Sequence, residues 1–292
     1  MEACLPSAFF FMEKHVALAC NPTTDNSKAL RVTDEVGLHL KKRGISCAYY
    51  TTNWPDNYEF FSDVWIIGGD GTLNFFLNKY PNIKKPLSVF PAGSGNDFHN
   101  MLYGDLTIAQ QVERILVGTT KHIDAGTCNG KLFINGVGIG FDGAIVKALL
   151  GKRKLAGKAS YLLAVLKNII SYKEQACHLY LNDRHIEEDV FMVSVTNGRS
   201  FGGGFLVTPN AMLDDALLDV NLVGRVPPLQ RLKYLPVIER GDHLELPFVQ
   251  SYKTSKVLIN CPIDLHAHLD GEYLTSNSFE IECLPAKFLF SV

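Results

Sequence analysis

A glycine-rich loop directly after a buried apolar segment constrains this chain more than any other feature. Residues 64–74 read VWIIGGDGTLN, so a strand-like apolar run ends on glycines, an aspartate and Thr72. Glycine lets backbone N–H groups approach a phosphate, and the N-terminus of the helix that Thr72 opens attracts anions. An aspartate among phosphates needs a cation beside it, so Asp70 also predicts Mg²⁺. The alternative is a plain strand-to-helix turn that Asp70 caps.

A second glycine loop follows the next apolar segment. Residues 90–101 read FPAGSGNDFHNM, with Gly93, Ser94 and Gly95 ahead of an acidic residue. In a parallel sheet, ligands bind where the carboxyl ends of strands pass into helices. Two such loops on successive strands therefore predict one shared cleft with an anion between them.

The first 120 residues alternate between strand and helix patterns. Short β-branched or aromatic runs bounded by turn residues indicate strands, and apolar residues at helical spacing indicate helices. This alternation predicts right-handed βαβ crossovers and a mainly parallel sheet covered on both faces. The expected strands are 15–22, 45–51, 64–69 and 87–93, and the expected helices are 27–43, 72–80, 96–102 and 107–117.

After residue 120 the pattern changes to strands in pairs. Asn129-Gly130 separates strand-like runs at 121–130 and 131–140, and Asn182-Asp183 separates runs at 177–183 and 185–198. Both dipeptides are typical of two-residue hairpin turns. The segment 255–274 has the same character, and helical patterns interrupt it only at 156–171 and 227–238. We therefore expect an α/β domain over residues 1–123 and a mostly β domain over 124–285.

Composition excludes several classes of protein. The 28 basic and 30 acidic residues give no charge that would favour nucleic acid. No apolar run approaches the ~18 to 20 residues of a membrane-spanning helix, and no basic segment precedes the apolar patch near the start, so we expect a cytoplasmic protein. Seven cysteines without CxxC spacing indicate buried free thiols rather than disulfides or structural zinc.

Taken together, the motifs resemble the diacylglycerol kinase catalytic domain family, which includes bacterial soluble lipid kinases and sphingosine and ceramide kinases. GGDGTLN followed by GSGNDF carries the resemblance, and NPTTDNSK, FINGVGIGFDG, PNAMLDDALLDV and LDGEYL match further family segments in order. The resemblance implies a Rossmann-like α/β nucleotide-binding domain and a C-terminal β-sandwich, with residues 286–292 returning to the first domain. It also implies an ATP-dependent lipid kinase that uses Mg²⁺, with ATP and lipid meeting between the domains.

The resemblance implies roles for individual residues. Glu272 corresponds to the general base, which must take the proton of a lipid hydroxyl that is barely ionised at neutral pH. Asp70, also expected to be catalytic, joins Asp97 and Asp124 in a water and Mg²⁺ network. Asp215, with the main chain of Met212 and Leu217, corresponds to a metal-binding loop. The nucleotide-binding positions are Asn21, Thr51, Gly68, Gly69, Asp70, Gly71, Thr72, Asn74, Gly93, Ser94 and Asn96.

The chain departs from the family pattern at several positions. Ala216 stands where the metal loop normally has glycine, so its turn must be made without a positive φ or with strain. The early loop NPTTDNSK lacks the usual glycine, WPDNYEF replaces a Gly-Asp-Ala motif after Thr51, and Asn100 stands where many relatives have arginine. These departures bear on single ATP and metal contacts more than on the class of enzyme.

Two motifs have simpler interpretations than a ligand site. Gly138 to Gly143 spells GxGxxG, but no acidic residue follows ~20 positions on, so we interpret it as a turn in the β domain rather than a dinucleotide site. His266, His268, Asp270 and Glu272 alternate and would share one strand face, where zinc is conceivable. We interpret them as a polar strand face.

The expected partner is a lipid at a membrane surface, contacted transiently, with no nucleic acid and with a homodimer left open. The basic run GKRKLAGK at 151–158 could attract anionic head groups or be a solvated loop. Two alternatives to a lipid kinase stay open: a small-molecule kinase like NAD kinase, favoured by GGDGT alone, and a nucleotide- or lipid-binding protein that has lost turnover, suggested by the altered metal loop.

Overall fold

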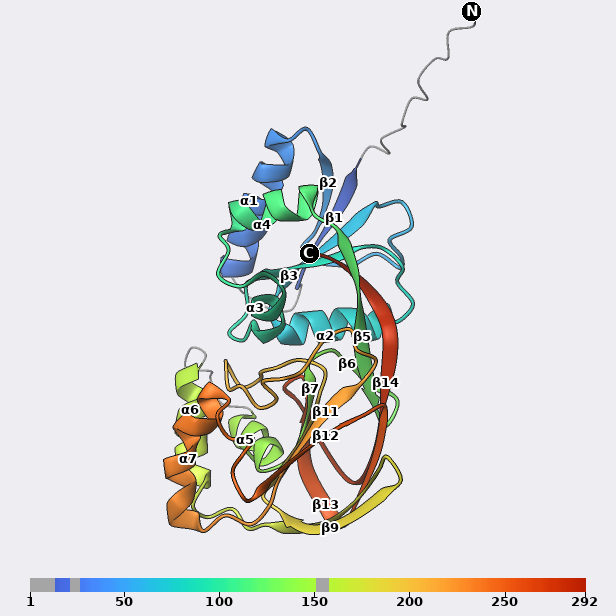
Figure 1. Ribbon diagram of the computed structural model, residues 1–292. Coiled ribbons are helices and arrows are strands. Elements are labelled where there is room, and N and C mark those ends of the chain that lie inside the picture. The colour runs from blue at the N-terminus through green and yellow to red at the C-terminus, as the bar shows by residue number, and fades with distance from the viewer. Residues whose placement is uncertain (1–13, 22–26, 151–157) are drawn as a thin grey trace, which may run out of the picture.

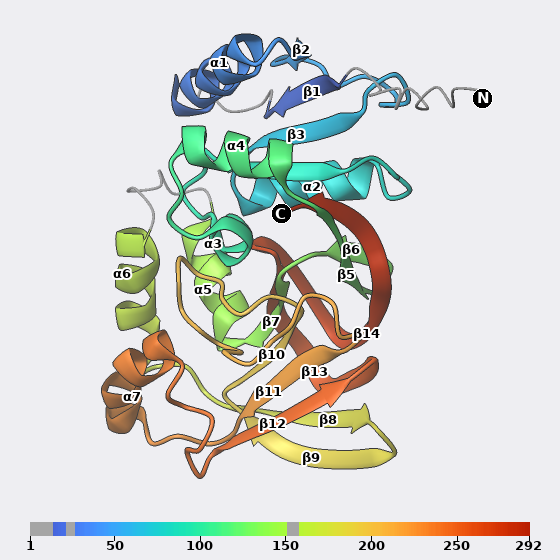
Figure 2. The same cartoon turned by 45° about the horizontal axis from the view of Figure 1, so that its top comes forward.

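A computed structural model describes residues 14–21, 27–150 and 158–292 of the chain. Its strands join into one long sheet in the order β12-β11-β10-β7-β13-β14-β4-β3-β1-β2, with β5, β6, β8 and β9 attached at the side. Figures 1 and 2 show an α/β body at the N-terminal end and a β-rich body below it. The GKRKLAGK run and the 22–26 part of the Asn-Pro loop lie almost entirely outside the described residues.

The N-terminal body is built on four parallel strands: β1 (His15–Cys20), β2 (Ser46–Tyr50), β3 (Asp63–Gly68) and β4 (Leu87–Pro91). The apolar run predicted from the sequence is buried along the whole of β3, as expected for a central strand with both faces covered. The four strands predicted in this region are confirmed, with ends that differ by one to two residues.

Helices cover both faces of this sheet. Alternate residues of β1 and β3, among them Leu18 and Trp65, pack toward α1 (Ser27–Lys42) and α4 (Ile108–Val117). The intervening residues, such as Ala17 and Ile66, pack against α2 (Asp70–Lys79). Because successive side chains of a strand point to opposite faces, the sheet has a separate hydrophobic core on each face. A shorter helix, α3 (Asp97–Tyr103), follows β4.

The C-terminal body is a β-sandwich whose strands turn back on themselves. Its strands are β5 (Thr120–Cys128), β6 (Lys131–Phe133), β7 (Gly136–Gly140), β8 (Gln175–Leu181), β9 (Arg184–Val190), β10 (Met192–Thr196), β11 (Leu218–Val223), β12 (Val249–Thr254), β13 (Lys256–Leu269) and β14 (Glu272–Ser291). Both predicted hairpins form, because Cys128 pairs with Lys131 and Leu181 with Arg184 across two-residue turns. Asn129, Asn182 and Asp183 have positive φ there.

The long strand β14 ties the two bodies together. Its first half, residues 272–282, pairs with β13, and its second half, residues 281–291, pairs with β5. Phe290 also pairs in parallel with Leu87 of β4. The Tyr103 hydroxyl donates to the Ser291 carbonyl at 2.6 Å. The final residues of the chain therefore complete the edge of the N-terminal sheet (Figure 1).

The sequence analysis missed one helix and joined two pairs of strands. Residues Phe141–Leu149 form α5, which follows β7 directly, so the GxGxxG segment is a strand-to-helix junction and not a turn. The helices predicted at 156–171 and 227–238 are α6 (Lys158–Asn168) and α7 (Pro228–Arg240). The runs 131–140 and 185–198 each contain two strands, because the chain moves to a new neighbour midway.

Candidate active site

The two glycine loops pack against each other backbone to backbone. The Gly68 carbonyl accepts from the Ala92 N–H at 2.9 Å, and the Gly95 carbonyl accepts from the Asp70 N–H at 3.3 Å. A Cβ added to Gly69 would lie 2.6 Å from the Gly95 oxygen and 2.8 Å from the Gly93 Cα. The two loops are close, as predicted, but they contact each other directly, and the shared cleft with an anion between them stays a prediction. Their glycines are needed for this close approach.

The Asp70 side chain extends from the first glycine loop to the residues that follow the second loop, and it joins the two. Its two carboxylate oxygens accept from the backbone N–H groups of Asp97 and Phe98, at 3.0 and 3.1 Å, and the Asn135 amide lies 3.4 Å away. The carboxylate thereby caps the N-terminus of α3. Burial raises the pKa of Asp70 above its ordinary range despite these hydrogen bonds. The side chain therefore acts first as a positioning group, and its predicted part in an Mg²⁺ network stays a prediction.

Asp97 provides a pH-dependent contribution to stability. Burial, and then the nearby Asp70 charge, raise the pKa of Asp97 from 3.8 to about 6, while the Gly203 N–H donates to its carboxylate. The folded protein therefore binds more protons than the unfolded chain between these pKa values, and this contribution to stability falls as pH rises from ~4 to ~6. Asparagine does not titrate, so in Asp97→Asn the free energy of unfolding should fall by about 2–3 kcal/mol less over this pH range than in the wild type. Urea unfolding of both proteins at pH 4.5 and 7 tests this, and equal pH slopes would contradict it.

The start of α2 and Glu272 lie side by side, and the space between them is called the mouth below. Gly69 is the N-cap of α2 and has no side chain with which to cap it, while the Asp70 N–H donates to the Gly95 carbonyl and the Thr72 N–H to the Gly69 carbonyl. Among the described residues, the Gly71 N–H of this first turn has no backbone acceptor and can bind an anion. Among the described residues other than its neighbours in the chain, a Cβ built on Gly71 would meet the Glu272 Oε1 alone within 4 Å, at 3.8 Å. Two residues about 200 positions apart in the sequence are thus neighbours, as the resemblance requires.

Glu272 is placed by a hairpin turn that the sequence analysis misinterpreted and that the buried Asp270 anchors. Asp270 and Gly271 have φ values of 45° and 87° and form a two-residue hairpin between β13 and β14, in which Leu269 pairs with Glu272. The Asp270 carboxylate accepts from the N–H groups of Ile134, Asn135 and Gly136 at 2.8–3.0 Å. The Asp-Gly dipeptide, which is typical of such turns, was the available signal.

The shared polar strand face that we expected for His266, His268, Asp270 and Glu272 is therefore wrong, and the zinc site that such a face made conceivable does not form there. Because the chain reverses at Asp270, Glu272 lies on the next strand and the four alternating residues do not share one face. His268 is buried, and burial lowers its pKa to about 4. His266 contacts the Tyr273 hydroxyl at 2.8 Å and the Lys147 ammonium at 3.0 Å.

The remaining predicted nucleotide positions divide into two groups. Three amides serve the architecture: Asn21 donates to Thr72, Asn74 donates to Asp270 and to the Leu132 carbonyl, and Asn96 closes its own loop against Gly93. Thr51 and the exposed Ser94 follow the carboxyl ends of β2 and β4, at the ligand-binding edge of the sheet. Their contact with a nucleotide stays a prediction.

The loop predicted to bind a metal holds an internal cation. The Lys253 ammonium lies 2.6 Å from an oxygen of Asp215 and 3.3 Å from Asp219. Ala216 has a φ of 60°, so its turn is made with strain, and its N–H donates to the Asp124 carboxylate at 2.7 Å. Asp124 also accepts from Ala286, so it joins this loop to the last segment of β14. The Lys253 ammonium and an Mg²⁺ ion cannot both bind the same Asp215 oxygen. The ligand role predicted for Met212, Asp215 and Leu217 stays a prediction.

Replacing Lys253 tests which cation this loop uses. Lys253→Met leaves Asp215 and Asp219 without their ammonium, so we expect a Tm several degrees lower without divalent ions and a recovery in Mg²⁺. The wild type should show no such response in the absence of nucleotide. Differential scanning calorimetry with and without Mg²⁺ makes the comparison, with Lys253→Met/Asp215→Asn as control. A wild type that Mg²⁺ stabilises through Asp215 would show that the ion displaces the lysine.

The GxGxxG segment is explained by packing. A Cβ on Gly138 would lie 2.5 Å from the His268 ring, and one on Gly143 would lie 2.2 Å from the backbone of β13. Gly140 has a φ of 90° at the start of α5. These glycines let α5 sit directly on β13, so the segment forms part of the sandwich.

Comparisons with known proteins agree with this arrangement. The diacylglycerol kinase catalytic domain matches residues 15–128, and the YegS C-terminal NAD kinase beta sandwich-like domain matches residues 135–290. A diacylglycerol kinase of Mycobacterium tuberculosis is 30% identical over 231 residues, which cover 76% of this chain and 74% of the relative. A protein described as "Probable lipid kinase YegS-like" from Pectobacterium atrosepticum is 31% identical over 234 residues, 77% of this chain and 76% of the relative.

The fold is likewise shared. A solved structure of a diacylglycerol kinase from Bacillus anthracis str. Sterne superposes with a TM-score of 0.72 at 21% identity, over 96% of each chain. Both the sequence matches and the paired glycine loops thus point to the same class of protein. The chain belongs to the family of lipid kinases that carry the diacylglycerol kinase catalytic domain.

Proposed function

We propose that this kinase transfers the γ-phosphate of ATP to the hydroxyl of a diacylglycerol or a related lipid, with Glu272 as the general base and Mg²⁺ accompanying ATP. The observation that carries the proposal is the position of the Glu272 carboxylate beside Gly71, in the first turn of α2. An anion-binding helix end and a proton acceptor then share one mouth, which is what attack of an alcohol on a phosphate needs.

Each part of the mouth has a separate task in this reaction. The Gly71 N–H at the N-terminus of α2 binds and orients the phosphate, and the glycines of the two loops let it approach the backbone without Cβ atoms in the way. Glu272 takes the hydroxyl proton as the bond to phosphorus forms. Asp70 and Asp270 keep the loops and the β13–β14 turn in register. When bound, Mg²⁺ neutralises charge on the phosphate oxygens.

An apolar cavity in the C-terminal body supports a lipid acceptor. It lies between α5, α6, α7 and the neighbouring strands, and aromatic and aliphatic side chains from all of these elements line it, among them Phe141, Val165, Phe191, Tyr234 and Phe248. Lipid acyl chains require such a dry surface. Arg231, at the wall, is buried and paired with Glu174 at 2.7 Å, so its charge is already compensated.

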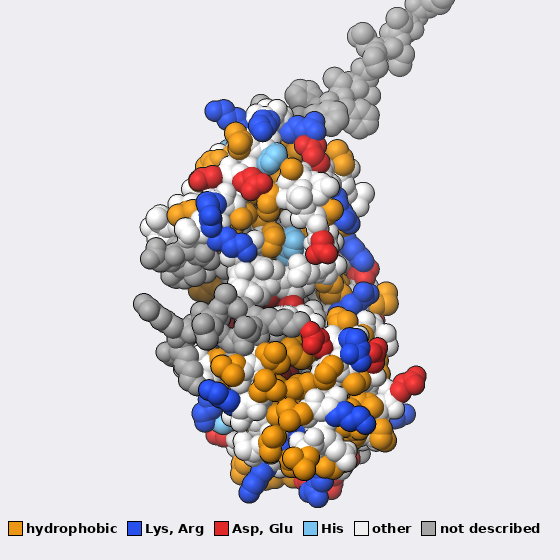
Figure 3. All heavy atoms as spheres, turned by 90° about the vertical axis from the view of Figure 1, so that its left-hand side faces the viewer, with side chains coloured by type: hydrophobic (Ala, Val, Ile, Leu, Met, Phe, Trp, Pro, Cys, Tyr) orange, Lys and Arg blue, Asp and Glu red, His pale blue; other side chains and the backbone are white. Residues whose placement is uncertain are grey.

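The outer surfaces of α6 and α7 support contact with a membrane. Figure 3 shows hydrophobic side chains gathered on the half of this face where α6 and α7 lie. The exposed residues there are Leu162, Leu163, Leu166, Ile170, Leu229 and Leu232, with Leu229 82% exposed. Within the described ranges, no helix combines the length and hydrophobicity that a membrane span requires. We therefore propose that this face touches the membrane peripherally while the lipid is phosphorylated.

The membrane contact makes a prediction that separates docking from chemistry. Charging α7 with Leu229→Glu/Leu232→Glu should lower the rate on long-chain lipid in vesicles at least about tenfold, because charged residues are not tolerated in the acyl boundary. The rate on a short-chain, water-soluble lipid should stay unchanged. Leu38→Glu on α1 is a matched control, since Leu38 is also exposed but lies on the other body. Equal losses on both substrates would point to a folding defect.

The experiment for the proposed function is a screen for phosphorylated lipids. A lipid extract is incubated with Mg²⁺ and ATP labelled in the γ position, and products made by the wild type but not by Glu272→Gln are identified by mass spectrometry. Label in one class of lipid alcohol supports the proposal. Label that enters added NAD and no lipid would contradict it.

A further inference from the structure

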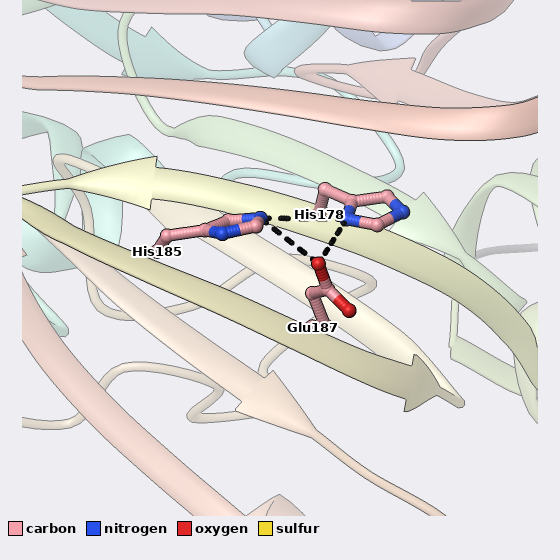
Figure 4. A group of neighbouring side chains, drawn as sticks. All are labelled: His178, His185 and Glu187. Carbon is pink, nitrogen blue, oxygen red and sulfur yellow. Dashed lines mark hydrogen bonds and ion pairs between the residues drawn. The ribbon is translucent and has the colours of Figure 1, made fainter.

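Two histidines and a glutamate meet on the β8–β9 hairpin, away from the kinase mouth. His178 pairs with Glu187 across the two strands, and Tyr180 pairs with His185. Because side chains alternate along a strand, these four residues share one face, while Cys177, Leu179 and Leu181 point into the sandwich core. Figure 1 places β9 at the end of the molecule opposite the parallel sheet, and Figure 4 shows the three polar side chains turned toward one another.

The spacing of their donor atoms matches a tetrahedral metal ion. His178 Nδ1 lies 3.4 Å from His185 Nε2 and 3.4 Å from Glu187 Oε1, and His185 Nε2 lies 3.6 Å from the same oxygen. An ion bound at 2.0–2.1 Å to nitrogen and oxygen in tetrahedral geometry requires its ligands about 3.3–3.4 Å apart. Among the described residues, these three side chains are the one group of three or more His, Cys, Asp or Glu residues whose ligand atoms all lie within 4.8 Å of one another.

The hairpin holds these donors in place. Its turn is a tight two-residue one, and the Asn182 amide donates to the Lys253 carbonyl at 2.6 Å, which ties the turn to β12. β8 also pairs with β13 through residues 178–180. The His185 ring stacks on Tyr180 with centroids 4.4 Å apart and an angle of 3° between the planes. Ligands on paired strands with a stacked ring lose little freedom on binding.

We propose that His178, His185 and Glu187 bind a Zn²⁺ ion, with water at the remaining position. Two imidazoles and one carboxylate favour zinc over Mg²⁺, which prefers oxygen ligands. The side chains are 39%, 42% and 66% exposed, so the open position faces solvent and could accept a ligand from another molecule. The ion would lock β8 to β9 and, by its distance from Glu272, would take no part in phosphoryl transfer.

Zinc titration of the full-length protein tests this site. The chain is stripped with a chelator, kept reduced, and titrated with Zn²⁺ against a chromophoric competitor. The variants are His185→Gln and Glu187→Gln, and His39→Gln on α1 controls for the loss of one histidine elsewhere. We expect the wild type and His39→Gln to bind one ion more tightly, by at least about tenfold, than either hairpin variant. Lipid kinase activity without zinc should be equal in all four proteins, which excludes misfolding.

The ligand geometry has its own readout. Co²⁺ in the wild type should give the visible absorption of a four-coordinate site, and Zn²⁺ should raise the Tm of the wild type but not of His185→Gln. If the wild type and both hairpin variants bind the same number of ions with the same affinity, the zinc is held elsewhere, for example by thiols, and the proposal fails.

Discussion

Glu272→Gln should lower kcat on the lipid substrate by about 10²–10⁴-fold while leaving ATP binding and the fold intact. A glutamine has the same shape as Glu272 but cannot accept the hydroxyl proton, so the loss falls on the chemical step. Glu272 lies at the exposed start of β14, where its carboxylate is near Gly71, so the change disturbs no buried contact. Steady-state kinetics with separate determination of kcat and KM provide the measurement.

The control for this experiment is a carboxylate on the same strand that has no part in the proposed chemistry. Glu280, further along β14, is exposed and pairs with Lys256, so Glu280→Gln changes the same charge on the same strand. We expect it to keep wild-type kcat. If Glu272→Gln retains more than about a tenth of the wild-type kcat, this carboxylate is not the base, because general bases contribute at least ~10²-fold.

Two glycines in one loop should respond in opposite ways to alanine. Gly71→Ala should keep the fold, since among the described residues outside its own turn the new Cβ meets Glu272 alone, at 3.8 Å. It should lower activity at least about 100-fold by placing a methyl group where the phosphate must approach. Gly69→Ala should destabilise the protein severely, because its Cβ would overlap the backbone of Gly93 and Gly95.

Thermal unfolding and nucleotide binding distinguish these outcomes. For Gly71→Ala we expect a wild-type Tm together with weakened ATP binding, and for Gly69→Ala a large loss of Tm or no soluble protein. A Gly71→Ala enzyme with normal turnover would show that the phosphate does not pass this position.

The fold could be predicted from the sequence where the pattern of apolar residues was typical of one kind of element. Strands β1, β3 and β4 are continuous apolar runs between turn residues, and α1 and α4 carry clear apolar faces, so both faces of the sheet were predictable. Helix α5 was missed because Gly143 and the apolar residues around it resemble a strand turn. Its glycine, Gly143, is explained by contact with the backbone of β13, which lies more than 110 residues later.

The candidate site was predictable in its parts but not in its connections. Gly71 and Glu272 were identified from motifs, yet nothing in the sequence shows that Asp70 caps α3 or that Asp270 binds the backbone around Asn135. The ammonium of Lys253 beside Asp215 also depends on pairing between β11 and β12. Such contacts join residues far apart in the chain, so a local pattern cannot reveal them.

The most direct test of the central claim is a crystal structure of the protein with a non-hydrolysable ATP analogue. The account predicts the terminal phosphates at the N-terminus of α2, within hydrogen-bonding distance of the Gly71 N–H and close to the Glu272 carboxylate. A nucleotide bound away from both glycine loops, with Glu272 out of reach of its terminal phosphate, would contradict it.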